Sequence, residues 1–544
     1  MTEVVTHDAP EVFVAPASYA QERVWFASQL ARDVPLYHVA GEVTLPYAVS
    51  YEQLGDALRV VCERHETMRT SFRIDDGVLM QVVHPDIVLP VELLDLSALP
   101  DAETDARIAA LLAGMDGADL SLVDPPLWHG TLARRGAADW VLLIVAHHTL
   151  FDLEAVRNLE SELVELCAAV VEGRAAVLPE LPIQYADHAV WQRDGMEAGR
   201  LAELNAFWSR ELDGLPAVHT LPAGRVRPAE RTYAGSEILF DFPDDIVEGV
   251  PTVAQRCGAT PFMVMLAGYA AMVHQLSRAT DVVVGVLVAG REVPETRALI
   301  GMFVNLAVSR IDVSGDPTFA ELVARVRDRQ LGVWDHQDMP FQKLVELVGT
   351  HRLPGVPPVY QLGFNYVDFG FSGRATAAED DLLLEISGSR GRLEYSTDVF
   401  TGSDAEAMVD GYLRVLSAVL ADPAARLSTV DGGAAPAPAA EGVAAVEVEA
   451  AFVAPRTAAE ELVAEVWSEV LGVSRIGALD NFFTLGGHSL LALRVIARIS
   501  AAIEIDLPIQ AFFVDTTVAG VAAQVEKMLL QELDDTENAS EGTP

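Results

Sequence analysis

Basic residues are scarce in this chain, which has 37 Lys and Arg against 80 Asp and Glu and a formal charge of −43 over 544 residues. A surface with this much negative charge repels the phosphate backbone of nucleic acids and the head groups of anionic lipids. The charge therefore argues against nucleic acid and membrane surfaces as partners. It favours solubility, and protein partners that present a basic face.

Cysteine is scarce too, since the chain has only Cys62, Cys167 and Cys257, far apart and without a Cys-x-x-Cys spacing. This argues against a zinc cluster and a disulfide framework, predicts no metal site, and fits a reducing compartment. The first residues, MTEVVTHDAPEVF, lack the basic start and apolar stretch of a signal peptide. No apolar run approaches the roughly 20 residues that span a bilayer. We therefore expect a soluble, cytoplasmic protein.

Length and composition indicate several domains. A chain of 544 residues, 51% of them hydrophobic, suggests three or four compact units. The main break in composition is a stretch rich in Ala, Pro, Gly and Glu, which predicts a flexible linker over residues 431–454. The acidic, polar residues 532–544 are predicted to be disordered.

Segments typical of strands and of helices alternate before the linker. The clearest of them are strands at 141–146 and 281–290 and helices at 51–65 and 262–276. Such alternation over most of the chain predicts α/β layers arranged in two lobes. We place these lobes at residues 16–178 and 179–430.

The segment after the linker, residues 455–531, has a helical pattern. Thr457 and Glu460 have the spacing of a capping box at the start of its first helix. Further apolar-periodic helices are expected at 485–499 and 516–529. The segment is therefore predicted to form a small helical bundle.

Ser489 lies at the start of the second of these helices, in the sequence DNFFTLGGHSLLALRVI (480–496). A serine in this place is also a favoured helix N-cap, which is the alternative reading. The sequence closely resembles the modification site of peptidyl carrier proteins, which are four-helix bundles. The resemblance implies that Ser489 carries covalent 4'-phosphopantetheine, whose thiol holds an aminoacyl or peptidyl thioester. A helix N-terminus suits the phosphate, because free N–H groups and the helix dipole meet there.

Two apolar residues near Ser489 are candidates for contacts with partner domains. These residues are Leu490 and Phe513. Packing in the core of the bundle is the alternative for each of them.

Two adjacent histidines, His147 and His148, end the apolar run VLLIVA, and Asp152 follows four residues later. A polar strand end with a helix N-cap would explain this pattern without any chemistry. The stretch HHTLFDL, however, resembles the His-His-x-x-x-Asp-Gly signature of condensation domains of non-ribosomal peptide synthetases. Further elements of that family follow in its order: SYAQERVWF (18–26), RHETMRTSF (64–72), YADHAVWQ (185–192), IGMFVNLAVSR (300–310) and DHQDMPFQKLVE (335–346).

This resemblance covers residues 16–430 and implies a pseudo-dimer of two lobes like those of chloramphenicol acetyltransferase, with the active site in a tunnel between them. It implies an acyltransferase-type reaction that forms an amide between a carrier-bound donor thioester and an aminoacyl group on the Ser489 arm. It also implies that His148 is the catalytic residue. An α-amine has a pKa of roughly 7.7–8.0 and histidine one of roughly 6.5, so a neutral imidazole can accept the proton released during attack. The contribution is expected to be as small as ~10²-fold.

The same resemblance suggests supporting roles for other residues. His147 is expected to fix the turn, and Asp152 to form a buried ion pair with an arginine. Arg64 is our first choice for that arginine and Arg69 the second. Asn305 is expected to line the tunnel.

The chain departs from the family pattern in two ways. Leu153 occupies the position of the signature's glycine, where it would be strained if the backbone had a positive φ, or would narrow donor access. No segment resembles an adenylation domain, which implies that a separate adenylation enzyme loads Ser489 in trans. The other expected partners are an upstream donor carrier protein, a phosphopantetheinyl transferase and a downstream condensation domain.

Other functions compete with amide formation. They are an epimerisation domain, an ester-forming condensation with a soluble acceptor, and an inactive scaffold that only docks the carrier. An epimerisation domain normally follows its carrier rather than preceding it. A heterocyclisation domain would need Asp at position 147, where this chain has His147.

Overall fold

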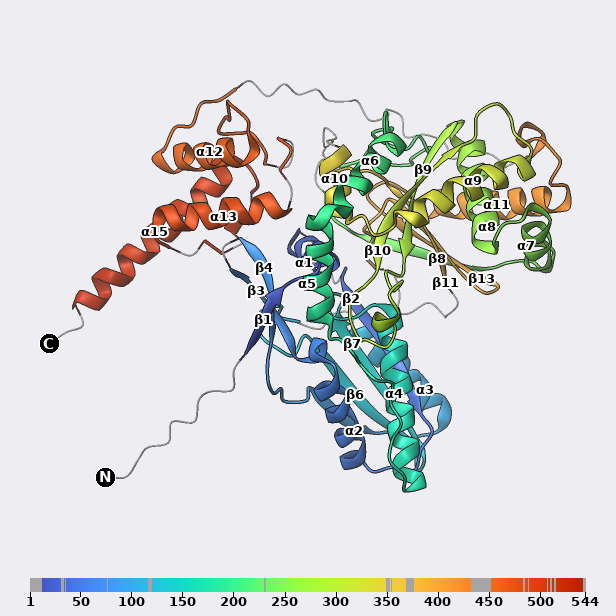
Figure 1. Ribbon diagram of the computed structural model, residues 1–544, viewed down its shortest axis with the longest axis horizontal. Helices are drawn as coiled ribbons and strands as arrows, with labels where there is room; N and C mark the ends of the chain where they lie inside the picture. The colour runs from blue at the N-terminus through green and yellow to red at the C-terminus, as the bar shows by residue number, and fades with distance from the viewer. Residues whose placement is uncertain are drawn as a thin grey trace.

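The computed structural model describes residues 12–30, 34, 36–75, 77–115, 120–228, 231–348, 353, 355–367, 376–431, 452–482, 485–487, 489–505, 507–508, 511–512 and 515–541. Within these ranges the chain forms two α/β lobes and a C-terminal group of helices (Figure 1). The predicted two-lobed α/β architecture is therefore confirmed. The predicted linker, 431–454, lies outside the described residues except at its two ends.

The N-terminal lobe contains two sheets, with strand orders β2-β7-β6-β5 and β1-β4-β3. Its strands are β1 (Phe13–Pro16), β2 (His38–Leu45), β3 (Thr70–Asp75), β4 (Val78–Val83), β5 (Val91–Asp95), β6 (Trp128–Gly136) and β7 (Asp139–His147). Its helices are α1 (Tyr19–Leu30), α2 (Tyr51–Arg64), the 3₁₀ turn η1 (Glu66–Arg69), α3 (Asp101–Met115) and α4 (Leu153–Glu172).

Strand β7 is apolar on both faces because helices cover both. Val141 and Leu143 pack in a cluster with α3, whereas Leu142, Ile144 and Ala146 belong to the core that includes α2 and α4. Since β7 is also paired on both edges, with β2 and with β6, no side of it meets solvent. This burial explains the continuous hydrophobic run and confirms the strand predicted at 141–146.

The C-terminal lobe contains one sheet of six strands in the order β10-β9-β11-β12-β13-β8. These strands are β8 (Gly235–Asp241), β9 (Asp281–Val288), β10 (Asn305–Asp312), β11 (Leu362–Val367), β12 (Leu382–Ser387) and β13 (Arg390–Ser396). The helices are α5 (Tyr185–Gly195), η2 (Met196–Arg200), α6 (Leu201–Glu211), α7 (Asp244–Cys257), α8 (Pro261–Ser277), η3 (Pro294–Thr296), α9 (Phe319–Asp335), α10 (Phe341–Val348), α11 (Gly402–Ala421) and η4 (Leu427–Thr429).

The two faces of this sheet differ in chemistry. On strands β12 and β13, Leu384, Ile386, Leu393 and Tyr395 pack into the core with α7, α8 and α11. The alternate residues of the same strands include Glu385, Arg392 and Glu394, which therefore share the opposite face. The helix predicted at 262–276 is confirmed as α8, which begins after its N-cap Thr260.

The C-terminal group contains α12 (Ala458–Leu471), α13 (Ser489–Ile503) and α15 (Val518–Glu541), with residues 511–512 also helical (Figure 1). Trp467, Phe482 and Phe512 form its aromatic centre, with ring centroids 5.0 Å and 5.1 Å apart in two of the pairs. Thr457 caps α12 as predicted, accepting the Glu460 N–H at 3.1 Å. The Glu460 carboxylate instead accepts the Arg456 N–H at 2.6 Å, so the box is only half formed.

The prediction of disorder from residue 532 is wrong up to Glu541, because α15 continues to that residue. The physical reason is local: the segment after Gly520 has no glycine or proline before Gly542, so nothing in it breaks the helix. Residues 542–544 lie outside the described part of the chain.

In the described part of the chain, no single helix is both long and apolar enough to cross a bilayer. Helices α7 and α8 are long and apolar enough to span a bilayer only when taken together, and the chain bends by 105° between them.

Candidate active site and carrier serine

The two histidines lie where β7 ends and the chain turns toward α4. Strand β7 ends at His147, and α4 begins at Leu153 after its N-cap Asp152. The backbone N–H of His147 donates to Leu127 O at 3.0 Å, and that of His148 donates to Tyr37 O at 2.8 Å. These bonds tie both histidines to neighbouring segments, so their side chains have defined positions.

His147 holds the turn. Its side chain is buried, and its Nδ1 accepts the backbone N–H of Thr149 at 3.2 Å while lying 2.9 Å from Thr149 Oγ1. Burial lowers the pKa of His147 well below its usual 6.5, and His38 and His148 lower it further. A neutral imidazole bound in this way fits the structural role predicted for it.

His148 is held in the tautomer that a base requires. Its Nδ1–H donates to the carbonyl oxygen of Phe151 at 2.5 Å, so Nε2 is the nitrogen that can accept a proton. Burial lowers the pKa of His148 below 6.5, against the bond to Phe151, which raises it. Arg23 also lowers this pKa, while Asp152 and Glu379 raise it. Near neutral pH the imidazole is therefore uncharged, which is the form able to take up a proton.

Asp152 joins the two lobes. Its carboxylate accepts the Ala155 N–H at 2.7 Å, which caps α4, and the Phe303 N–H at 3.0 Å. It also forms a buried ion pair with Arg291, whose Nη2 lies 2.9 Å from Oδ1 and 3.1 Å from Oδ2. Arg291 and Phe303 flank β9 and β10 in the C-terminal lobe, and the guanidinium lies 4.1 Å from the Phe303 ring centroid.

The predicted pairing of Asp152 with Arg64 or Arg69 is wrong. Arg64 binds Glu162 of α4, with Nε to Oε2 at 3.1 Å and Nη2 to Oε1 at 3.0 Å. The Arg69 guanidinium donates to backbone carbonyls, including that of Cys62 at 2.9 Å. The physical reason is that Asp152 points across the lobe interface, where Arg291 of the C-terminal lobe meets its carboxylate.

Two further sequence expectations concern the surroundings of His148. Asn305 is not among the residues that line the cavity described below, and its Nδ2 donates to Gln337 O at 2.8 Å and Met339 O at 2.7 Å. Its place in the tunnel stays a prediction. Leu153 is the first residue of α4 and is not among the described residues with positive φ, so the strain considered for it is absent. It does not line that cavity either.

A cavity of about 170 Å³ lies between the two lobes, and Tyr37 is one of its lining residues. It lies between α1, α10 and the entrance to β12, and residues of both lobes line it: Arg23, Phe26, Ala27, Tyr37, Arg231, Tyr233, Leu306, Phe341, Gln342, Val345, Pro357, Pro358, Tyr360, Glu379 and Asp380. His148 is not itself a lining residue, but the Tyr37 carbonyl accepts its backbone N–H, and Arg23 and Glu379 act on its charge, so the cavity lies near the His148 turn. Sequence reasoning missed these residues, although Arg23 lies inside the element SYAQERVWF and signalled this region.

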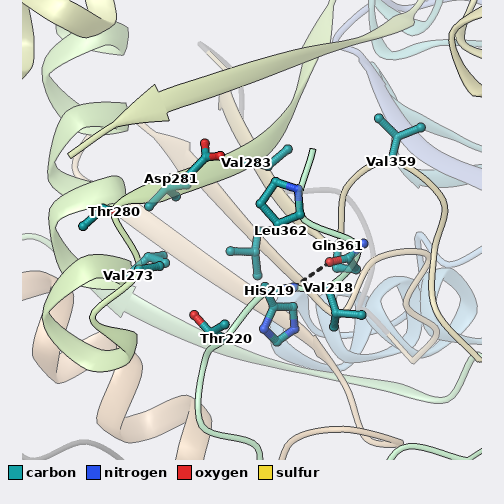
Figure 2. Close-up of a pocket in the computed structure, with 13 residues that line it drawn as sticks. Val218, His219, Thr220, Val273, Thr280, Asp281, Val283, Val359, Gln361 and Leu362 are labelled. Carbon is teal, nitrogen blue, oxygen red and sulfur yellow. Dashed lines mark hydrogen bonds between the residues drawn. The ribbon is translucent and has the colours of Figure 1, made fainter. Parts of the chain in front are cut away.

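A second cavity, of about 210 Å³, lies within the C-terminal lobe (Figure 2). Its residues come from the segment 216–220, the end of α8 and the start of β9 and β11. His219 and Gln361 face each other there, with the His219 N–H donating to Gln361 Oε1 at 2.9 Å. None of its lining residues lines the cavity beside His148.

Ser489 is the first residue of α13. It follows Gly486, whose φ of +93° favours glycine, and Gly487, where a Cβ would lie 2.3 Å from the Phe482 ring. The serine therefore begins a helix behind a tight glycine turn, and the backbone N–H groups of such an end suit a phosphate. The side chains of Ser489 and Leu490, and all of Phe513, lie outside the described part of the chain.

Comparison with protein families gives two matches along the chain. The model of the condensation domain matches residues 13–432, and that of the phosphopantetheine attachment site matches residues 461–525. The chain belongs to the condensation-domain family. It carries a carrier-type domain behind the condensation domain, and Ser489 lies within the matched carrier region.

Relatives of the condensation domain are parts of large peptide synthetases. One component of the linear gramicidin synthase of Brevibacillus parabrevis is 32% identical over 427 residues, which are 75% of this chain and 6% of that protein. Phosphinothricin tripeptide synthetase PhsC of Streptomyces viridochromogenes is 37% identical over 370 residues, 68% of this chain and 34% of that protein. The chain thus spans only a small part of each relative.

A solved structure shares the fold. The four-domain non-ribosomal peptide synthetase holo-AB3403, crystallised with AMP and glycine, has a TM-score of 0.69 at 21% identity. The match covers 86% of this chain and 37% of that protein. The two lobes thus have the condensation-domain fold, as the sequence predicted.

Proposed function

We propose that the condensation domain forms an amide bond between a carrier-bound donor thioester and an aminoacyl group held on the Ser489 arm of the same chain. The observation that carries this proposal is the state of His148, which is neutral, held through Nδ1 by Phe151, and near a cavity that both lobes line. Among the described residues, its Nε2 has no hydrogen-bond partner. The phosphopantetheine arm supplies the thiol that carries the amino acid.

His148 acts on the attacking nitrogen. As the amine forms its bond to the donor carbonyl carbon, the nitrogen becomes a strongly acidic ammonium, and His148 Nε2 takes its proton. The carbon–sulfur bond of the donor then breaks, and the imidazolium returns the proton to the sulfur that leaves. The donor acyl group ends as an amide on the aminoacyl group of the Ser489 arm. His148 also positions the amine, which supports the rate by orientation.

Loading in trans is part of the proposal. Residues 433–460 separate the two matched regions and are far too few for an adenylation domain between them. We therefore propose a separate adenylation enzyme, together with a phosphopantetheinyl transferase, an upstream donor carrier and a downstream condensation domain as partners. A cytoplasmic location belongs to the same proposal, because these partners act inside the cell.

Intact mass spectrometry tests this scheme. The protein is converted to its phosphopantetheine form and offered a panel of adenylation enzymes with their amino acids, and then a donor-loaded carrier protein. We expect one mass increase for each step: the arm, the amino acid and the donor acyl group. The Ser489→Ala variant is the control and should show none of them, whereas Ser468→Ala, which alters a serine of α12, should show all three.

Two outcomes would contradict the proposal. An amino acid that is inverted on the arm with no gain of donor mass would favour epimerisation. A loaded arm that never accepts a donor, whatever carrier is supplied, would favour a scaffold without condensation activity.

A further inference from the structure

Aromatic side chains form one part of the wall of the cavity beside His148. They belong to Tyr37, Tyr233, Tyr360, Phe26 and Phe341, and the other lining residues include two arginines and two acids. The volume of the cavity is about 170 Å³. Aromatic faces attract cations, and guanidinium and ammonium groups are commonly bound between them.

Asp380 contributes an unpaired carboxylate to this cavity. It lies against β11, where a Cβ on Gly363 would be 2.6 Å from Asp380 Oδ2, so the glycine leaves room for the carboxylate. Among the described residues, no hydrogen bond or ion pair is made by the Asp380 side chain. Burial raises the pKa of Asp380 well above its usual value and Glu379 raises it further, whereas Arg231 lowers it. A bound cation would favour the ionised form of this carboxyl group.

The cations around Asp380 are already engaged elsewhere. Arg23 Nη1 lies 3.3 Å from Glu379 Oε1. Arg231 Nη2 donates to the carbonyl oxygens of Ala378 at 3.2 Å and Glu379 at 2.6 Å, and its guanidinium lies 4.7 Å from the Tyr233 ring centroid. The charge of Arg231 acts on the Asp380 carboxyl group, but no guanidinium or ammonium among the described residues forms an ion pair with it.

The adjacent residue, Asp381, differs from Asp380 because its carboxylate is paired with a cation. Arg227 Nη1 donates to its Oδ1 at 2.8 Å. His219, the residue seen in Figure 2, donates from Nε2 to its Oδ2 at 3.1 Å. These contacts hold the pKa of Asp381 below its usual value against the effect of burial, the opposite of the shift at Asp380.

Arg23 provides a second unsatisfied group in the same cavity. Its side chain is 10% exposed, and its Nε is buried without an acceptor among the described residues. Arg23 and Asp380 both line the cavity, which therefore presents a guanidinium and a carboxyl group to a ligand.

We infer that this cavity selects a substrate whose side chain ends in a cation, a primary ammonium or a guanidinium, which pairs with Asp380. The inference rests on the proposed condensation function and names its substrate class. The α-amine of the acceptor is a separate group, because it must lose its proton to His148. The cationic side chain belongs either to the amino acid on the Ser489 arm or to the donor acyl group, and the experiment separates these two sources.

The test compares lysine with norleucine, which has an uncharged side chain of nearly the same length and shape. In the first arm, lysyl and norleucyl groups are placed on Ser489 by transferring their pantetheine conjugates, and one neutral donor is supplied. In the second arm, one neutral amino acid is placed on Ser489, and lysyl and norleucyl donors are compared. The measured quantity is the ratio of the two single-turnover rates of amide formation.

We expect the lysyl rate to exceed the norleucyl rate by at least ten-fold in one arm. In the Asp380→Asn variant this ratio should fall to near one, whereas Asp244→Asn, which removes an exposed carboxylate of α7, should leave it unchanged. A second measurement tests cation binding without a charged substrate. The rate of the norleucyl reaction of the parent protein is measured with n-butylammonium and with n-butanol, and the charged compound should inhibit it more strongly. This difference should vanish in Asp380→Asn.

Ratios near one in both arms, with amides still formed, would overturn the inference and leave the condensation function intact. A ten-fold preference that survives in Asp380→Asn would overturn it as well, because the selection would then lie elsewhere. A failure to form any amide in either arm would instead contradict the proposed function.

Discussion

At the scale of single residues, the decisive feature is the hydrogen bond from His148 Nδ1 to Phe151 O. It fixes the tautomer, and burial keeps the imidazole neutral. His148 was singled out by the resemblance of HHTLFDL to the family signature, because a polar strand end would also explain a histidine pair alone, and its catalytic role stays a prediction. The sequence was not sufficient to find Arg291, because the partner of Asp152 lies 139 residues away and nothing in the local sequence of either residue points to the other.

The lowered pKa of His148 makes a prediction about pH. A base works in its neutral form, so its contribution is complete above its pKa and is lost as the pH falls through that value. Because burial places the pKa below 6.5, amide formation should lose its His148 contribution only below that pH, by about ten-fold per pH unit. The measurement is the single-turnover rate of the loaded protein between pH 4.5 and 9.

The control for this profile is the same measurement on His148→Ala. The substrate α-amine, with a pKa of roughly 7.7–8.0, titrates in both proteins, so in both the rate falls as the pH drops through this range. Only the parent protein should show the additional acid limb. A profile with the same acid limb in both proteins would contradict the assignment of that limb to His148.

At the scale of helices and strands, the sequence predicted most where burial is uniform. Strand β7 and helix α8 are apolar throughout because packed elements surround them, and both lie where their hydrophobic runs indicated. Residues 532–541 were predicted wrongly, because an acidic, polar composition indicates disorder while the absence of glycine and proline lets α15 continue. Composition and helix propensity disagree in such a segment, and the sequence does not show which of them prevails.

The turn from β7 to α4 also shows the limits of reasoning from a motif. Leu153 replaces the signature's glycine, which suggested strain or a narrowed tunnel. In the structure it takes the first position of α4 behind the Asp152 cap, where leucine is a good helix former. The departure from the family pattern therefore needs no compensation in the backbone.

At the scale of the whole molecule, the cavity beside His148 depends on how the lobes meet. Arg23 and Tyr37 come from the N-terminal lobe, and Asp380 and Tyr360 from the C-terminal lobe. A sequence does not reveal which side chains two lobes bring together, so the cavity and its unpaired carboxylate could not be predicted. The Asp152–Arg291 ion pair crosses the same interface and holds the His148 turn in a fixed position relative to the C-terminal lobe.

This ion pair makes a prediction about stability. Breaking a buried pair leaves an uncompensated charge, so Asp152→Asn and Arg291→Gln should each lower the free energy of unfolding by ~3–5 kcal/mol. Arg174→Gln, which breaks a more exposed pair with Glu165, should lower it far less, because solvent screens an exposed pair. Urea unfolding followed by tryptophan fluorescence measures these changes.

Double variants distinguish the observed pair from the one that the sequence suggested. The effects of Asp152→Asn and Arg291→Gln should be strongly non-additive, because the two side chains are in contact. Those of Asp152→Asn and Arg64→Gln should add, because Arg64 binds Glu162 instead. Additivity in the first pair and coupling in the second would contradict the interface described above.

The most direct test of the central claim, that the neutral His148 imidazole drives amide formation, is the rate of a single turnover. The protein is loaded on Ser489, mixed with a donor-loaded carrier, and stopped at short times for mass analysis. We predict that His148→Ala lowers this rate by ~10²-fold or more, whereas His129→Ala, which alters an exposed histidine of β6, leaves it unchanged. A His148→Ala protein that forms the amide at the parental rate would contradict the account.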